Sequence, residues 1–215
     1  MRWYPITEGE VTVRLPSTTT VLDVTMAQSR RDTLVRAEMA NPLSYTLRRE
    51  AALARGTAVD HWFKTSLDAG RVLPRPHAVD AQCRRLLPLL RGILRMKAPF
   101  WTDEVVHSTA LGYAGTLDVV ATLPGGLRAV IELKTSAYTI WPEAIAEAQL
   151  QATAYFLAWG RMYPDRPVDA IATYHVTPYM LHTQVTHKPE AIQKLTAAWL
   201  RRLKHFASRF NQMEL

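Results

Sequence analysis

The sequence predicts an α/β fold in which helices flank a central mixed β-sheet. Three observations lead to this prediction. Helical patterns fill most of the first half of the chain, strand patterns follow in the second half, and one helical segment interrupts the strands. A helix between strands supplies the crossover that a parallel pair needs, whereas short glycine-containing turns suit antiparallel pairs. We therefore expect a mixed sheet, with the helical N-terminal half lying over it as a wall or an arch.

The first half of the chain is expected to hold one strand and three helices. The strand covers 11–15 and leads into a run of hydroxyl residues. Prolines at Asn41-Pro42 and in Pro74-Arg75-Pro76 cannot continue a helix, so they divide the helical region. Helices are expected over 29–39, 44–67 and 78–96.

The second half is expected to hold the sheet. Strands are predicted over 99–107, 111–122, 127–135, 168–176 and 180–185, with a helix over 142–159 between the third and the fourth. A final helix over 189–206 places apolar residues at helical spacing. We expect one domain over 1–215, with a mainly helical part (1–98), a core sheet (99–186) and a C-terminal helix (187–215).

Composition limits the function classes. The hydrophobic content of 48% and the charged content of 21% are typical of a globular protein. No apolar run is long enough to span a bilayer and the N-terminus does not resemble a signal or transit peptide, so we expect a cytoplasmic protein that does not bind membranes. The single cysteine, Cys83, excludes an internal disulfide and a four-cysteine iron-sulfur cluster. A net charge of +7 and a pI of about 9.8 predict a polyanionic partner.

The most informative segment is a glycine-rich approach to Asp118, followed by a turn and then by Glu132-Leu133-Lys134. Leu123-Pro124-Gly125-Gly126 supplies turn residues between two antiparallel strands. Because side chains alternate along a strand, Asp118, Glu132 and Lys134 are expected on one face. In the register that we expect, Asp118 lies opposite Val130 and forms a diagonal pair with Glu132, about 7 to 8 Å away.

Two carboxylates and a lysine on paired strands suit the metal-dependent cleavage of a phosphodiester. Carboxylates favour Mg²⁺ or Mn²⁺ over zinc, and such an ion activates water and neutralises phosphate charge. Lys134 would orient or deprotonate the water, or offset charge in the transition state. The alternative is an ordinary ion pair on an exposed strand. The apolar neighbours Val119, Val130 and Ile131 favour a site, because charges within apolar strands need a reason to be there.

Two further motifs accompany this hairpin. Gln151 and Tyr155 are one turn apart on the helix over 142–159 and project from one face. His61 lies in the helix over 44–67, a few residues after a glycine, although a lone helical histidine is more often structural. In the order His, Asp, Glu-x-Lys and Gln-x-x-x-Tyr, these motifs resemble the RecB-like branch of the PD-(D/E)xK nuclease superfamily. Leu117 departs from the superfamily's proline, but Gly115 matches the Gly-x-x-Asp form of this branch.

The resemblance implies a PD-(D/E)xK nuclease fold and a Mg²⁺- or Mn²⁺-dependent nuclease. It implies that the metal ligands are His61, Asp118, Glu132 and the backbone carbonyl of Leu133. It also implies that Lys134, Asp118 and Glu132 are catalytic and that Gln151 and Tyr155 line the active site. Glu104, on the preceding strand, is either a second contact to the metal region or a plain surface acid.

A narrower resemblance lies in Leu15–Leu22. This segment is similar to the Pro-Ser-x-Thr-x-Val-Leu segment of mitochondrial genome maintenance exonuclease and its phage and bacterial relatives, which act on single-stranded DNA ends. It implies DNA contacts by Ser17, Thr18 and Thr20. We also expect DNA contacts by Tyr113, which is close in sequence to the motifs, and by Gln151 and Tyr155 of the RecB-like motif. An equally good interpretation of the hydroxyl run is a helix N-cap, made by Ser17 or Thr18.

These observations predict a deoxyribonuclease, specifically a single-stranded-DNA exonuclease. They leave its pathway open among DNA repair, recombination, phage replication and adaptive immunity. Two alternatives stay open: an endonuclease or duplex-specific nuclease with the same site, and a catalytically silent nucleic-acid-binding module. The aromatic residues Trp62, Tyr113, Tyr138 and Trp141 lie close in sequence to the motifs and would either stack on bases or belong to the core. The chain has no Walker lysine motif and therefore no predicted helicase motor.

Overall fold

The structure is a computed structural model and describes residues 1–213, so the last two residues of the expected C-terminal part lie outside it. A central five-stranded sheet has the strand order β3-β6-β7-β8-β9. β7 and β8 are parallel, and the other neighbouring pairs are antiparallel, which confirms the predicted mixed sheet. The strands are β3 (Trp101–Thr102), β6 (Val119–Thr122), β7 (Arg128–Thr135), β8 (Ala170–Val176) and β9 (Leu181–Thr186).

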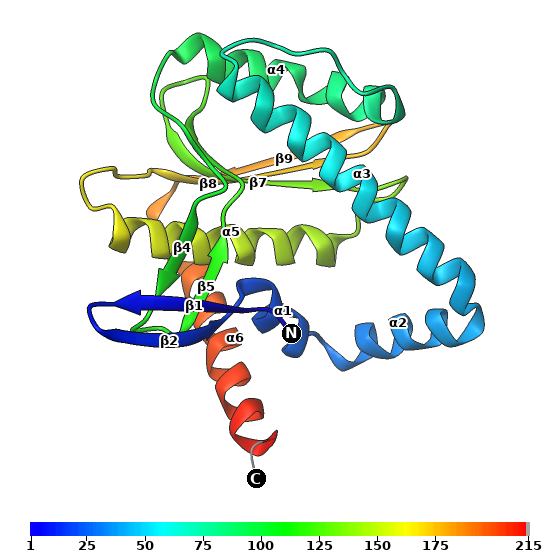
Figure 1. The fold of residues 1–215 in the computed structure, drawn as a ribbon, viewed down its shortest axis with the longest axis vertical. Helices are drawn as coiled ribbons and strands as arrows, with labels where there is room; N and C mark the ends of the chain where they lie inside the picture. The colour runs from blue at the N-terminus through cyan, green and yellow to red at the C-terminus, as the bar shows by residue number, and fades with distance from the viewer. Residues whose placement is uncertain (214–215) are drawn as a thin grey trace.

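Helices cover both faces of this sheet (Figure 1). α3 and α4 pack on one face, and α5 packs on the other and provides the crossover from β7 to β8. The helices are α2 (Gln28–Ala40), α3 (Pro42–Asp68), α4 (Asp80–Met96), α5 (Pro142–Met162) and α6 (Pro189–Met213). Each was expected to within a few residues except α6, which continues beyond the expected end. The 3-10 turn His77–Val79 precedes α4.

Two small hairpins and a short helix were not expected as such. β1 (Trp3–Glu8) pairs with β2 (Val11–Pro16), and β4 (Val105–Ser108) pairs with β5 (Tyr113–Thr116). The pattern of β1 was missed because Pro5 interrupts it, and proline is confined to positions such as this outer strand. The hydroxyl run forms the N-terminus of α1 (Thr18–Val24).

The expected strand over 111–122 is in fact two strands in different sheets. After β5 the chain bends at Leu117 and Asp118, and β6 then joins the central sheet. Backbone hydrogen bonds fix the bend: the Leu117 amide donates to the Glu104 carbonyl, and the Asp103 amide donates to the Asp118 carbonyl. The hydrogen-bonded partner segment is interrupted at Asp103 and Glu104, which divides the expected strand over 99–107 into β3 and β4. Asp118 therefore stands at the point where the chain enters the central sheet.

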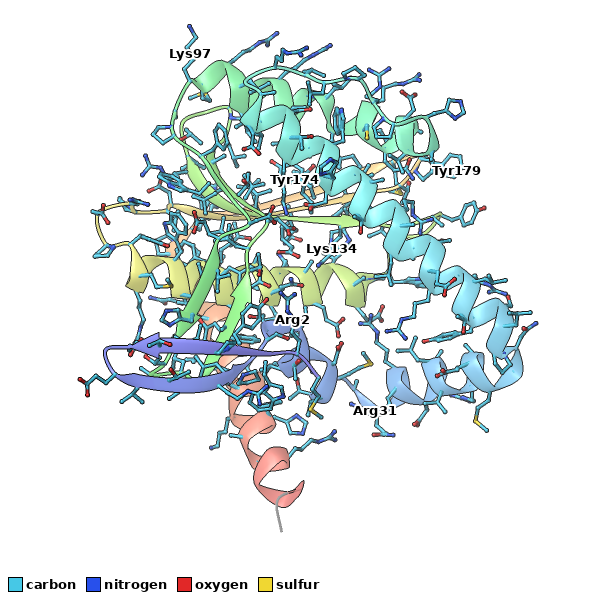
Figure 2. The ribbon with its side chains drawn as sticks, in the orientation of Figure 1. Arg2, Arg31, Lys97, Lys134, Tyr174 and Tyr179 are labelled. Carbon is cyan, nitrogen blue, oxygen red and sulfur yellow. The ribbon has the colours of Figure 1, made fainter. Side chains whose placement is uncertain are left out.

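Alternation along the strands separates two cores. Val119 and Ile131 face α3 and α4, whereas Val120 and Val130 face α5. Figure 2 shows the same division, with Tyr174 and Lys134 on opposite sides of the sheet. By this parity Glu132 and Lys134 lie on the α5 face, together with Val130.

α2 and the first half of α3 extend away from the body as a bent arm, residues 28–54 (Figure 1). Asn41 begins α3 by accepting a hydrogen bond from the Ser44 amide, and Pro42 occupies its first turn. Only the second half of α3 enters a core, through residues such as Val59 and Phe63. No helix within residues 1–213 is long and apolar enough to cross a membrane.

Candidate active site

The β6–β7 hairpin places Asp118 directly opposite Glu132. Val119 pairs with Ile131, so the register extends to Asp118 and Glu132 and differs by two residues from the predicted one, in which Asp118 faced Val130. The turn explains the difference. Leu123 and Leu127 close it through a backbone hydrogen bond of 2.8 Å, and Gly125 and Gly126 adopt positive φ. A shift of two keeps both carboxylates on one face and brings them closer than the expected diagonal pair.

Asp118 directly precedes β6, and its carboxylate forms a hydrogen bond with the backbone of β7. The Leu133 amide donates to Asp118 Oδ2 over 2.9 Å, which fixes the carboxylate beside β7. The side chain of Asp118 is 22% exposed, and its other oxygen, Oδ1, lies 3.7 Å from the ammonium of Lys64. The carbonyl of Leu133 belongs to the same stretch of backbone, and its expected role as a metal ligand stays a prediction.

Glu132 is a buried carboxylate with one oxygen bonded and the other free. It is 1% exposed, its Oε1 lies 2.5 Å from Lys134 Nζ, and its Oε2 has no hydrogen-bond partner in the described part of the chain. Burial and the neighbouring charge of Asp118 raise the pKa of Glu132 to about 8, although Lys134 acts in the opposite direction. The charged form of Glu132 is therefore disfavoured in this site, and a bound cation would stabilise it.

Lys134 lies on the same face as Glu132, as predicted from the alternation along β7. Burial acts to lower the pKa of Lys134, but the charges of Glu132 and Asp118 outweigh it, so the pKa lies above its ordinary value. Its side chain is 37% exposed. Lys134 is therefore a charged group that solvent or a substrate can reach.

A second lysine in the site was missed by the sequence analysis. Lys64 on α3 is 6% exposed, and its ammonium lies 2.8 Å from Asp60 Oδ2, 2.6 Å from Asp103 Oδ1 and 3.7 Å from Asp118 Oδ1. Burial alone would lower the pKa of Lys64, but these carboxylates raise it. The signal was present in the sequence, because Asp60 and Lys64 are one helical turn apart among apolar residues that enter the core.

The residues that contact Lys64 from α3 and from the segment after β3 are Asp60 and Asp103. The sequence analysis had selected their neighbours, His61 and Glu104. His61 is exposed. It follows Asp60 on α3, so it projects from another face of the helix. Burial and Asp118 raise the pKa of Asp60, and its Oδ1 has no partner among residues 1–213. Glu104 contributes its backbone carbonyl to Leu117, while its neighbour Asp103 holds Lys64.

Gln151 and Tyr155 lie together under the hairpin. Gln151 Nε2 donates to the Tyr155 hydroxyl over 3.1 Å, and both side chains are buried on α5. Gly115 allows this arrangement, because a Cβ there would lie 2.5 Å from Tyr155 Cε1 and 3.1 Å from Thr18 Oγ1. The Gly-x-x-Asp pattern thus has a steric cause in this chain, since only glycine lets the tyrosine approach β5.

The hydroxyl run caps α1 and packs inward. Ser17 accepts a hydrogen bond from the Thr20 amide, Thr18 donates to the Ala114 carbonyl, and Thr20 donates to the Arg2 carbonyl. All three side chains are buried, so the N-cap interpretation describes this run. Thr19 is the exposed hydroxyl of the run.

Tyr113 does not reach a position from which it could contact DNA. Its side chain is 0% exposed, and its hydroxyl donates to the Ala154 carbonyl over 2.8 Å. Its ring packs edge-to-face against Trp199. The expected DNA contact by Tyr113 is therefore wrong, because β5 belongs to the small sheet and turns this side chain into the core. Trp62 is likewise buried, and its indole donates to the Leu73 carbonyl.

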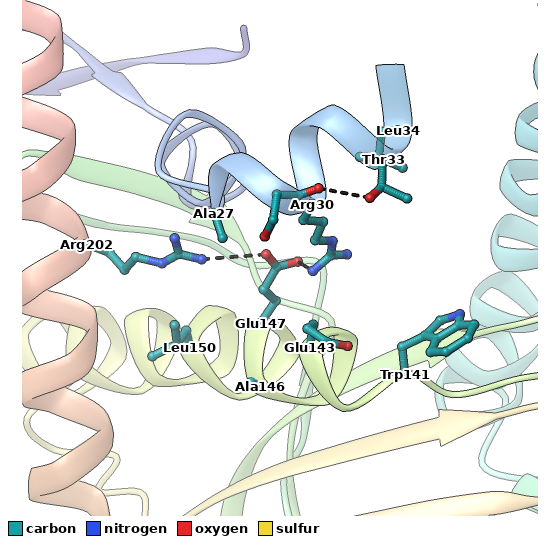
Figure 3. Close-up of a pocket in the computed structure, with 11 residues that line it drawn as sticks. Ala27, Arg30, Thr33, Leu34, Trp141, Glu143, Ala146, Glu147, Leu150 and Arg202 are labelled. Carbon is teal, nitrogen blue, oxygen red and sulfur yellow. Dashed lines mark hydrogen bonds and ion pairs between the residues drawn. The ribbon is translucent and has the colours of Figure 1, made fainter. Parts of the chain in front are cut away.

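Two cavities adjoin this region. One of about 240 Å³ is lined by residues that include Thr19, Lys134, Gln151 and His175. A larger one of about 680 Å³ lies between α2, α5 and α6, where Glu147 forms ion pairs with Arg30 and Arg202 (Figure 3). Glu147 borders both cavities. The smaller cavity adjoins the candidate site through Lys134 and Gln151, but neither Asp118 nor Glu132 is among its lining residues.

Asp118 and Glu132 fit a hard divalent cation as a pair. They face each other across the hairpin, and Glu132 Oε2 is buried without a partner. Within residues 1–213, no three histidine, cysteine or acidic side chains come together as a metal-binding group. Ligation of a metal by His61, which is exposed on α3, stays a prediction. An ion held by two carboxylates would keep water in its other positions, which is usual for Mg²⁺.

Comparisons with known proteins give distant structural likenesses. No family model matches the chain, and no curated protein matches it by sequence. The solved structure of SSO0001 is 14% identical, with 72% of this chain and 73% of that chain covered and a TM-score of 0.36. A "putative exonuclease" from Eubacterium rectale is 14% identical, with 73% and 66% covered and a TM-score of 0.46. Neither likeness is high enough to assign the chain to a family.

Proposed function

We propose that this protein is a metal-dependent deoxyribonuclease. The observation that carries the proposal is the buried carboxylate of Glu132, which lies opposite Asp118. Its Oε1 lies 2.5 Å from Lys134 Nζ, and its Oε2 has no hydrogen-bond partner among the described residues. A buried carboxylate without a full set of partners is costly for stability, so its place between two charged groups indicates a role in binding or catalysis.

The chain's own residues divide the work of phosphodiester hydrolysis. Mg²⁺ or Mn²⁺ held by Asp118 and Glu132 would supply charge neutralisation and a more acidic water. Lys134 stays protonated beside Glu132, so its role is to offset negative charge on the reacting phosphate and not to remove a proton. The hydrogen bond between Gln151 and Tyr155 would hold these two side chains in place beside the hairpin.

Single-stranded DNA is the substrate that we propose, with cleavage from an end. The net charge of +7 favours a polyanion. The cavity beside Lys134 has about 240 Å³, which suits a single nucleotide unit better than a duplex. End-directed cleavage is the finer part of the proposal and has its own test below.

The test uses end-labelled and circular single-stranded DNA. The purified protein should degrade the linear strand with Mg²⁺ or Mn²⁺, stop with a chelator and leave the circle intact. Asp118→Asn, Glu132→Gln and Lys134→Met should each lose at least about a hundredfold in kcat. Asp165→Asn, which changes a carboxylate on an exposed loop, is the matched control and should keep full activity. Cleavage of the circle would indicate an endonuclease, and full activity in the three site variants would refute the site.

A catalytically silent nucleic-acid-binding module is the second candidate, and Lys64 is the observation that favours it. Its ammonium already neutralises part of the acidic cluster without any metal. Calorimetric titration with Mn²⁺ separates the two candidates. The nuclease proposal expects ion binding that disappears in Asp118→Asn, whereas a silent module should bind DNA but show no such ion binding.

A further inference from the structure

The carboxyl ends of the parallel strands β7 and β8 bring two loops side by side next to Lys134. Lys134 pairs with His175, and the Ser136 amide donates to the Val176 carbonyl over 3.0 Å. The chain segments 136–141 and 177–180 therefore leave the sheet at the same edge. In open α/β sheets, ligands bind outside the carboxyl ends of parallel strands, and β7 and β8 are the parallel pair of this sheet.

The cavity at this edge contains a histidine that the proposed reaction leaves without a role. His175 is 3% exposed and borders the cavity together with Lys134 and Ser136, and its Nε2 has no partner among residues 1–213. Burial, Lys134 and His182 lower the pKa of His175 to about 4, so the imidazole is neutral at physiological pH. A neutral, buried imidazole without a partner lacks a hydrogen bond that a ligand in the cavity can supply.

The charges around this cavity are compatible with a phosphate-bearing ligand. Lys134 supplies a partly exposed ammonium, and Thr19 and Ser136 add hydroxyl groups. Two carboxylates also border the cavity. Both carboxylates have positive charges beside them: Glu147 is paired with Arg30 at 2.8 Å and with Arg202 at 3.5 Å, and Arg30 and Arg31 act electrostatically on Asp23.

Two tyrosines at the same edge offer exposed ring faces. Tyr138 is 73% exposed and Tyr179 is 65% exposed. Their rings are inclined by only 18°, with centroids 6.3 Å apart. With Trp141 at 65%, they are the most exposed aromatic side chains in the described part of the chain, and all three belong to the segments that follow β7 and β8. Aromatic faces that remain in solvent are available to stack on an unpaired base, which every base permits.

We propose that this edge is a subsite for one unpaired nucleotide of the substrate strand, with its sugar-phosphate beside Lys134 and His175 and its base against Tyr138 and Tyr179. This inference rests on the proposed nuclease function and names the residues that would select an unpaired strand. Bases in a duplex are stacked on their neighbours, so they cannot offer a free face to the two rings. His175 acts here as a positioning residue.

The test measures the binding of a short fluorescent single-stranded oligodeoxynucleotide by anisotropy, in chelator, so that no cleavage occurs. Tyr138→Ala/Tyr179→Ala should raise Kd by about tenfold or more, which one lost base-stacking contact produces. Tyr138→Phe/Tyr179→Phe should bind like the wild type, because the rings remain. Leu200→Ala, an exposed apolar residue on α6, is the control for a general surface change. An unchanged Kd in the double alanine variant would overturn the subsite.

An abasic oligonucleotide and His175 variants complete the test. The abasic strand should bind the wild type about tenfold more weakly and should bind the double alanine variant no differently from the normal strand. His175→Phe should raise Kd severalfold, whereas His175→Gln should restore part of the affinity through its amide. Binding in chelator does not depend on catalysis. If the protein shows these differences in binding but never cleaves DNA, the subsite is supported and the nuclease proposal is refuted. If it cleaves DNA but shows none of these differences, the nuclease proposal is supported and the subsite is refuted.

Discussion

The two faces of β7 and β8 are built from alternate residues of the same strands and differ in how well their side chains are satisfied. Under α3 and α4, Ile131 and Ala172 belong to an apolar core. Under α5, the next residues are Glu132, Thr173 and His175, each of which is buried and carries a polar atom without a partner in the described residues. The first face is apolar along this stretch, whereas the second combines the apolar Val130 with unsatisfied groups that a ligand can use. Period-two alternation lets a single strand present both faces.

The comparison predicts opposite responses to mutation on the two faces. On the α3 and α4 face, removing a side chain should cost stability. On the α5 face, removing an unpaired polar group should cost little stability or increase it, because such a group loses its hydration on folding without replacement. The variants below compare the faces in order of expected effect.

Ile131→Ala should give the largest effect. Ile131 is 0% exposed in the apolar core, and truncation of such a residue leaves a cavity that costs about 2 to 5 kcal/mol. The free energy of unfolding, measured with urea, checks this. Thr183→Ala on the exposed side of β9 is the control and should change it by less than about 0.5 kcal/mol. A loss below about 1 kcal/mol for Ile131→Ala would contradict the assignment of this face to stability.

Lys64→Met should destabilise the protein by about 2 kcal/mol in chelator, because three carboxylates lose their shared ammonium. The figure lies below that for a fully buried pair, since the side chains of Asp60 and Asp103 are 36% and 63% exposed. The free energy of unfolding, measured with urea, checks this. A loss below about 0.5 kcal/mol would contradict the role of Lys64 as the shared partner of these carboxylates.

Glu132→Gln should remove a pH dependence of stability. The pKa of Glu132 is raised to about 8 in the folded protein, so the folded state holds a proton that the unfolded chain has released. Its contribution is fully present below the ordinary glutamate pKa and is lost as the pH rises toward about 8. In chelator, wild-type stability should therefore fall by about 1 kcal/mol or more between about pH 5 and pH 8. The variant should show a clearly smaller slope, and equal slopes would contradict the raised pKa.

Thr173→Val should give the smallest effect, an increase in stability of up to about 1 kcal/mol. Thr173 is 1% exposed and its hydroxyl has no partner, so the similar shape of valine should fill the site without the desolvation cost. Thermal unfolding measures the change. A loss of stability of more than about 1 kcal/mol would mean that the hydroxyl does have a partner in solution.

Sequence patterns predicted what depends on local spacing. The turn at Gly125 and Gly126 and the alternation along β7 were enough to place Asp118, Glu132 and Lys134 on one face. The predicted register of β6 and β7 differed from the observed one by two residues. The register depends on the backbone hydrogen bond between Leu123 and Leu127 that closes the turn, and composition does not define that bond.

The remaining errors come from tertiary arrangement. One residue along a helix rotates a side chain by about 100°, so the packing of α3 decides between Asp60 and His61. Tyr113 is buried because the chain changes sheets after β5, which a continuous strand pattern conceals. His175 and Lys134 come together only through the parallel pairing of β7 with β8 across α5.

The most direct test of the central claim is the anomalous diffraction of a crystal soaked in Mn²⁺. We predict a single strong peak at the paired carboxylates of Asp118 and Glu132, and its absence in a crystal of Asp118→Asn. A wild-type crystal without a peak there, or with manganese bound only elsewhere, would contradict the account.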